Sequence, residues 1–184
     1  GWTDGLPVVP PTPDRVQAML GFAGVAAGDV VGTVPERSRN ITAEKAAINA
    51  VMAGCEPQHF PVVLAGIAAM CDPAFGCNTA VTSTGGAALC LAISGPNLEA
   101  LGLNANRNAL GPGYRANATI GRALQLLIRN VGGGKPGGID RATLGNPGKY
   151  TFCFAEDESD DAWSTLAMDQ GYSRDESVVI LFAG

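Results

Sequence analysis

The spacing of hydrophobic positions changes several times along the chain, which predicts helices interleaved with strands. Residues 117–131 give the clearest helical pattern, because apolar and polar positions fall on opposite faces at helical spacing. The apolar positions are Ile120, Leu124, Leu127, Ile128 and Val131, and the polar ones are Arg122, Gln125 and Arg129. We expect an amphipathic helix here, with one side buried.

Three helices are expected in the first half of the chain. Thr12 and Pro13 are suited to begin a short helix that ends near Gly21, and Thr42 can cap a helix over residues 43–52. The stretch from about residue 57 or 60 to residue 70 is apolar nearly all round and too long for an average strand. It is therefore expected to be a central, buried helix.

Strands are indicated by short runs of β-branched and apolar residues between turn signals. The expected strands are 30–34, 79–84, 88–95, 150–154 and 178–183. Brief helices are expected at 96–101 and 163–168, a loop at 36–40, and an acidic loop at 156–161. Prolines make residues 6–13 an extended arm within an N-terminal segment of about residues 1–13.

This alternation predicts an α/β or α+β fold, a layered sheet with helices packed on it. With 184 residues and 46% hydrophobic content, the chain can bury one sizeable core, so residues 1–184 are expected to form a single compact domain. The sequence begins without a Met or a signal-like segment, as expected of a chain that lacks the first residues of its gene product or is one part of a longer protein.

Charge and cysteine content narrow the possible partners and the compartment. A net charge of −5 argues against nucleic acid, and no apolar run is long enough to cross a membrane. Cys55, Cys71, Cys77, Cys90 and Cys153 are an odd number of thiols in apolar surroundings. That pattern favours free thiols in a reducing compartment, so a cytoplasmic protein is expected.

Residues 104–138 concentrate asparagines, arginines and glycines immediately before and after the amphipathic helix. Amides, guanidinium groups and the free N–H groups of a helix start all bind anions, which predicts a binding site for a small anionic substrate. Arg107 and Arg115 are expected to hold the anion. The expected substrate-binding residues are Asn104, Asn106, Arg107, Asn108, Tyr114, Arg115 and Asn117. An ordinary structural loop is the alternative interpretation.

Catalytic candidates lie elsewhere in the sequence. Cys55, between two expected helices, is followed by Glu56 and by His59, the only histidine. A helix dipole or a cation can lower a thiol pKa, although most buried cysteines only pack. Ser83 and Thr84 precede paired glycines whose amides could stabilise an anion, but the segment lacks the spacing of a hydrolase nucleophile elbow.

No metal site or cofactor motif is recognisable, so no metal is expected and the cofactor stays open. Cys71 and Cys77 do not have the spacing of zinc ligands. The GGGKPGG segment at 132–138 lacks the spacing of a phosphate-binding loop and follows a helix instead of preceding one. A helix cap is the favoured interpretation, with Lys135 able to close over a ligand.

Several longer segments together resemble the UGSC-type (seleno)protein family and its companions. These segments are DGLPVVPPT at 4–12, VPER at 34–37, ITAEKAAINAVMAGC at 41–55, FPVVLAGIAAMCDP at 60–73 and NRNALGPGYRANATIGRA at 106–123. The likeness covers most of the chain, but the Gly-Ser-Cys motif that names the family does not occur. The resemblance implies a thiol- or selenol-linked enzyme system in which this chain is a companion subunit or one domain. It transfers no catalytic residue.

The sequence therefore predicts an enzyme or enzyme subunit acting on a small anionic organic substrate, with thiol-assisted reductase or lyase chemistry. Two alternatives stay open. One is hydrolysis of a small amide or ester through Ser83, and the other is a non-catalytic assembly subunit. In each case a homo- or hetero-oligomer is expected.

Overall fold

The computed structural model describes residues 1–160 and 162–184. Its helices are α1 (Pro13–Ala23), α2 (Ala43–Ala53), α3 (Phe60–Cys71), α4 (Cys77–Thr82), α5 (Arg115–Asn130) and α6 (Leu166–Asp169). Its strands are β1 (Val30–Val34), β2 (Arg39–Thr42), β3 (Leu89–Ser94), β4 (Cys153–Ala155) and β5 (Val178–Ala183). Short 3-10 turns occupy Pro35–Arg37 (η1), Pro57–His59 (η2) and Pro147–Lys149 (η3).

The predicted helices α2, α3 and α5 are confirmed. Thr42 caps α2 by accepting a hydrogen bond from the Lys45 N–H at 3.3 Å, and Gly54 ends that helix with a left-handed φ of 98°. Helix α3 buries Phe60, Val63 and Ile67 in the core. Helix α5 buries the apolar side that its sequence pattern predicts.

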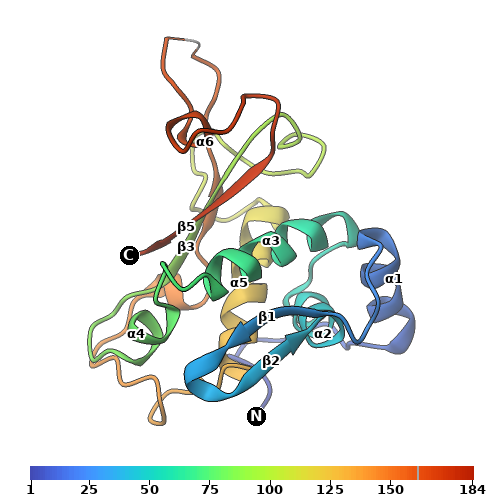
Figure 1. Ribbon diagram of the computed structural model, residues 1–184, viewed down its shortest axis with the longest axis vertical. Helices are drawn as coiled ribbons and strands as arrows, with labels where there is room; N and C mark the ends of the chain where they lie inside the picture. Colours follow the sequence, from blue (N-terminus) through green and yellow to red (C-terminus); the bar gives the residue numbers. More distant parts are fainter. Residues whose placement is uncertain (161) are drawn as a thin grey trace.

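A three-stranded mixed sheet forms the second layer. Its order is β4-β3-β5, with β3 parallel to β4 and antiparallel to β5, and every residue of β3 is buried. Strands β1 and β2 form a separate antiparallel hairpin. Helix α3 contacts both β5 and β1, and in Figure 1 it lies across the middle of the molecule between the sheet and the hairpin.

These layers confirm the expected α/β class. Helix α5 packs on β3 and β4 and also against α2, so the hydrophobic core lies between the helices and one face of the sheet. At the opposite end of the sheet, loop 95–103 and the segments 156–160 and 162–177, which include α6, meet above the strands (Figure 1). The Glu158 carboxylate joins them by accepting the Ser94 hydroxyl at 2.7 Å and the Gly95 N–H at 2.6 Å.

Two local predictions are wrong. Residues 79–84, expected to be a strand, belong mostly to α4, which follows Gly76 in a left-handed conformation. Arg37 from the end of η1 donates two hydrogen bonds to the Asn78 side chain, so a tertiary contact helps to hold this short helix against its strand-like sequence. Residues 96–101 form turns instead of a brief helix.

Other boundaries shift by a few residues. The expected loop at 36–40 contains η1 and the start of β2, and the strand expected at 150–154 begins only at Cys153. The acidic segment is irregular as predicted, although its last position, residue 161, lies outside the described residues. No helix in the described ranges is both long enough and apolar enough to cross a bilayer.

Candidate functional site

The asparagines predicted to bind substrate hold their own loop together. Asn117, in the first turn of α5, accepts the Asn104 N–H at 2.8 Å and donates to the carbonyls of Asn104 at 2.9 Å and Ala109 at 3.0 Å. Both asparagine side chains are buried, and the Asn104 amide donates to the Arg107 carbonyl at 3.1 Å. The structure therefore uses Asn104 and Asn117 to fix the 104–109 backbone.

The remaining predicted binding residues lie on the outside of this loop. Asn106, Arg107, Asn108 and Tyr114 are exposed, and Asn108 adopts a left-handed φ of 64° while its amide donates to the Pro112 carbonyl. Within the described ranges the guanidinium group of Arg107 makes no hydrogen bond. An exposed, solvated arginine on a turn is a weak basis for a binding site.

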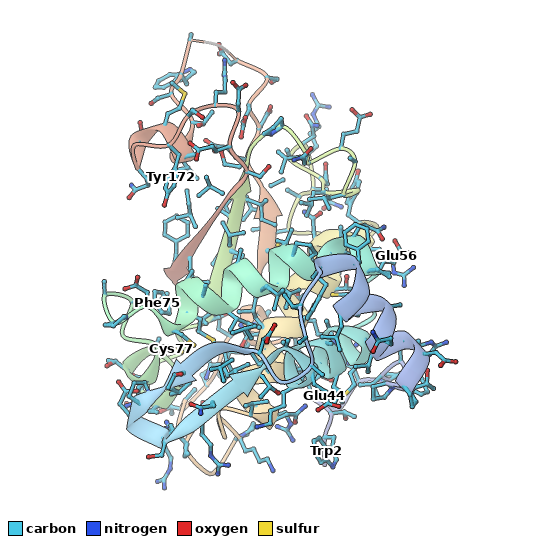
Figure 2. All side chains as sticks on the ribbon, turned by 45° about the vertical axis from the view of Figure 1, so that its right-hand side comes forward. Trp2, Glu44, Glu56, Phe75, Cys77 and Tyr172 are labelled. Atoms are coloured by element: carbon cyan, nitrogen blue, oxygen red, sulfur yellow. The ribbon has the colours of Figure 1, made fainter. Side chains whose placement is uncertain are left out.

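Arg115 is brought together with Glu56, one of the catalytic candidates. Its guanidinium group forms an ion pair with Glu56 at 2.7 Å and donates to the Gly54 carbonyl at 3.0 Å. Both side chains are substantially exposed, and the pair links the start of α5 to the segment between α2 and α3. Figure 2 shows Glu56 near one end of α3 and Cys77 near the other. The Arg115–Glu56 pair therefore belongs to the junction of three helices.

His59 serves as a structural link at the same junction. Its Nδ1 accepts the Glu56 N–H at 3.1 Å, so Nε2 carries the hydrogen and donates to the Leu101 carbonyl at 3.1 Å. Burial lowers the pKa of His59. Both ring nitrogens are occupied, which leaves neither of them open to a substrate proton in this conformation.

Cys55 is buried and its thiol is held in the neutral form. Burial raises the pKa of Cys55 to about 12, although Thr119 and Arg115 act in the opposite direction. Burial likewise raises the pKa of Cys77 to about 12 and that of Cys90 to about 11. Because the thiolate is the reactive form, these surroundings disfavour a nucleophilic role for Cys55.

Ser83 lies at the end of α4, where its hydroxyl accepts the Gly85 N–H at 2.9 Å. This is the geometry of a local serine turn. In the part of the chain that the structure describes, no hydrogen bond joins Ser83 to a histidine or a lysine. The geometry around Ser83 therefore supplies no base for the predicted hydrolase.

A sizeable cavity lies elsewhere, in a cleft between α5 and the irregular segment 134–150. Its volume is about 670 Å³, within the range of small-molecule sites. In Figure 1 this segment follows α5 and lies beside α4, and the Thr143 N–H donates to the Thr84 carbonyl at 3.0 Å. Its charged and amide-bearing lining residues are Asp4, Gln125, Arg129, Asp140, Asn146 and Lys149.

Both acidic side chains in the cleft already have cationic partners. Asp4 binds Arg122 through two contacts of 2.8 and 2.9 Å, and Asp140 binds Lys149 at 2.7 Å. Burial raises the pKa of Asp4, but the hydrogen bonds and the positive charge of Arg122 outweigh that effect, so the Asp4 pKa is lowered overall. Arg129 is different, because its Nε is buried and forms no hydrogen bond with any described residue. Arg129 also takes part in none of the ion pairs among the described residues, so its positive charge is uncompensated there.

A run of backbone amides adds hydrogen-bonding capacity to the same cleft. Leu144, Gly145 and Asn146 all line it, and Gly145 has a left-handed φ of 77°. Their N–H groups make no hydrogen bond to the described residues. By contrast, the N–H groups of Gly148 and Lys149 donate to the Asn146 side chain and carbonyl, respectively. Consecutive free amides around a left-handed residue are typical of anion-binding loops.

Sequence reasoning missed this cleft, although two of its signals are visible in the sequence. Arg129 lies on the polar side of the predicted helix, and the glycine-rich segment 132–138 follows it directly. Lys135, the predicted lid residue, is exposed and does not line the cleft. Across residues 1–160 and 162–184, no three His, Cys, Asp or Glu side chains come together as a metal site.

Comparisons with known proteins give no indication of the function. The chain matches no family model, no curated protein and no solved structure. The resemblance to the UGSC-type family therefore stays a prediction from the sequence.

Proposed function

We propose that the protein binds a small organic anion in the cleft between α5 and segment 134–150, with Arg129 as the principal contact. The observation that carries this proposal is the buried, unpaired Nε of Arg129 at the wall of a cavity of about 670 Å³. A buried donor without a partner is costly, and a guanidinium group is suited to pair with a carboxylate. A bound anion would remove that cost.

The charges around the cleft support an anion over a cation. Asp4 and Asp140 are each engaged by a cationic side chain, so neither offers a free carboxylate to a positively charged ligand. The free amides of residues 144–146 are donors as well. The unpaired Arg129 Nε and these free amides therefore favour a negatively charged or oxygen-rich ligand.

This cleft would provide the substrate-binding half of the small-anion enzyme or enzyme subunit that the sequence predicts. Arg129 thus replaces Arg107 and Arg115 as the residue proposed to hold the anion. It assigns no chemical step to Cys55, because burial keeps that thiol protonated near neutral pH.

Calorimetric titration with acetate, benzoate and inorganic phosphate, at constant ionic strength, tests the proposal. Arg129→Gln should weaken binding by roughly 10- to 150-fold, as expected for a lost charged hydrogen bond. Arg107→Gln is the matched control and should leave affinity unchanged, since that side chain is exposed. Binding that depends on Arg107 and not on Arg129, or no binding of any of these anions, would overturn the proposal.

The open edge of β5 favours a second candidate function, assembly with another chain. Ala88 and Gly184 form a hydrogen-bonded pair, in which each N–H group donates to the carbonyl of the other residue. In an antiparallel ladder every second residue pair lacks such bonds, so the N–H and C=O groups of Val179, Leu181 and Ala183 point away from β3. We propose that an extended strand of a partner chain pairs with this edge.

Ala183→Pro tests this second candidate, because it removes one outward N–H group without interrupting the ladder to β3. In native mass spectrometry, the variant should shift an oligomer of the wild-type chain toward monomer while its far-ultraviolet circular dichroism stays the same. A wild-type chain that is monomeric at micromolar concentration, both alone and with its copurifying proteins, would refute pairing at this edge.

A further inference from the structure

We infer that the ligand of this cleft is an amphipathic monocarboxylate, with one carboxylate on Arg129 and an apolar body against the opposite wall. This inference rests on the proposed function. It adds a ligand class that the unpaired guanidinium group alone does not specify.

Part of the cleft wall is an extension of the hydrophobic core. Val81 of α4, Leu89 of β3 and Ile128 of α5 line it, and both Leu89 and Ile128 are buried. Three elements thus converge to present aliphatic side chains to the same cavity that Arg129 enters. Water against such a wall is displaced favourably by an apolar group of a ligand.

The rim of the cleft carries large apolar side chains that the fold leaves in solvent. Both Leu144 and Tyr150 line the cleft, yet Leu144 is 97% exposed and Tyr150 is 50% exposed. Leu144 gains almost no stability from burial in the protein alone, and Tyr150 gains only part of what full burial would give. A ligand with an apolar body would cover part of both, which explains why such side chains stand at the mouth of this cavity.

The charge balance indicates a single negative charge on the ligand. Asp4 and Asp140 are neutralised by Arg122 and Lys149, which leaves only Arg129 to compensate a ligand. A second negative charge would lie in a cleft that already contains two carboxylates and would have no free cationic side chain among its lining residues. Dianions such as succinate and hydrogen phosphate should therefore bind less tightly than a monocarboxylate of similar size.

The apolar wall can be tested with a series of carboxylates of increasing length. Acetate, butanoate and hexanoate should bind with affinities that rise by about fourfold for each methylene that becomes buried. Succinate serves as the dianionic comparison, and so does inorganic phosphate when all titrations are made at a pH at which its dianion predominates. All titrations are made by calorimetry at one ionic strength, on the wild-type chain and on Arg129→Gln.

Leu144→Ser probes the apolar rim, with Leu110→Ser as its matched control on another loop, where the leucine is 63% exposed. Leu144→Ser should reduce hexanoate affinity by at least fourfold and leave acetate affinity unchanged, because acetate has no methylene group to bury against the rim. Leu110→Ser should change neither affinity. Equal loss in both variants would overturn the role assigned to Leu144.

The outcomes separate this inference from the proposed function on which it rests. Affinities that depend on Arg129 but do not rise with chain length, or that are higher for succinate and phosphate, would overturn the amphipathic monocarboxylate and leave the anion site standing. Affinities that Arg129→Gln does not alter, or no binding by any of the five compounds, would overturn both.

Discussion

Replacing Asn117 by Ala tests whether the asparagine-rich loop is held by internal hydrogen bonds or exists to bind a ligand. The side chain is 3% exposed and makes three hydrogen bonds to the 104–109 backbone. The substitution removes all three at once. It also leaves the Asn104 N–H group without its buried acceptor.

The expected loss of stability is about 3.5 kcal/mol. Each hydrogen bond contributes roughly 1 kcal/mol net, and a buried group left unsatisfied costs a further ~1 kcal/mol or more. The better helix propensity of Ala returns about 0.5 kcal/mol within α5. A loss of this size is a large part of the roughly 5–15 kcal/mol that stabilises a typical domain.

Urea unfolding followed by circular dichroism measures the effect. With a slope of about 2 kcal/mol per molar urea, the midpoint of Asn117→Ala should fall by roughly 1.75 M. Asn106→Ala is the matched control, because this asparagine is exposed and its side chain makes no hydrogen bond to the described residues. Its midpoint should stay within about 0.25 M of the wild-type value, since surface substitutions cost at most about 0.5 kcal/mol. Similar midpoints for the two variants would refute the structural role of Asn117.

Other substitutions and conditions should give equally specific results. Gly121→Ala should cost about 1–3 kcal/mol in urea unfolding, because its Cβ would lie 2.7 Å from a backbone nitrogen of the segment leading into β4. In Gly21→Ala of α1 the added Cβ would have no atom within 4 Å, so this variant should instead be more stable by up to about 1 kcal/mol. A gain of stability in both variants would contradict the close approach of the backbone at Gly121. Burial lowers the pKa of His59, so the unfolded chain takes up the proton first as the pH falls. Stability should therefore decline from about pH 7 to pH 5, below the ordinary histidine pKa, and His59→Gln should lack this part of the decline. Burial also raises the pKa values of Cys55 and Cys153, so both should resist a thiol reagent at pH 8 until urea unfolds the chain. Rapid labelling of native Cys55 would restore the thiolate hypothesis.

Local sequence signals predict the helices well because the deciding interactions are themselves local. The Thr42 cap and the Gly54 stop lie within one turn of α2, and both operate as expected. The structure of segment 79–84 is not decided by local interactions alone. Its alternating pattern fits a strand, but the Arg37 contact to Asn78 comes from residues far back in the chain, and the segment folds as α4 instead.

The cleft could not be located from the sequence because its parts come from distant segments. Asp4 and Arg122 are 118 positions apart, yet their ion pair helps to define one side of the cavity. Arg129 lies on a polar helix face, and such a face usually meets water. Whether this face of α5 meets water or a cavity depends on where segment 134–150 packs. That segment is irregular, and its sequence has no periodic pattern from which its packing could be predicted.

The central position of β3 has a consequence for the order in which the chain can fold during synthesis. All six of its residues are buried, yet its neighbours β4 and β5 begin only at Cys153 and Val178. Helices α1 to α3 can pack on one another long before those strands leave the ribosome. Until then β3 is an apolar strand with two open edges, the form most prone to pair with another nascent chain. Chaperone dependence should therefore be greatest while the chain between β3 and β5 is being made.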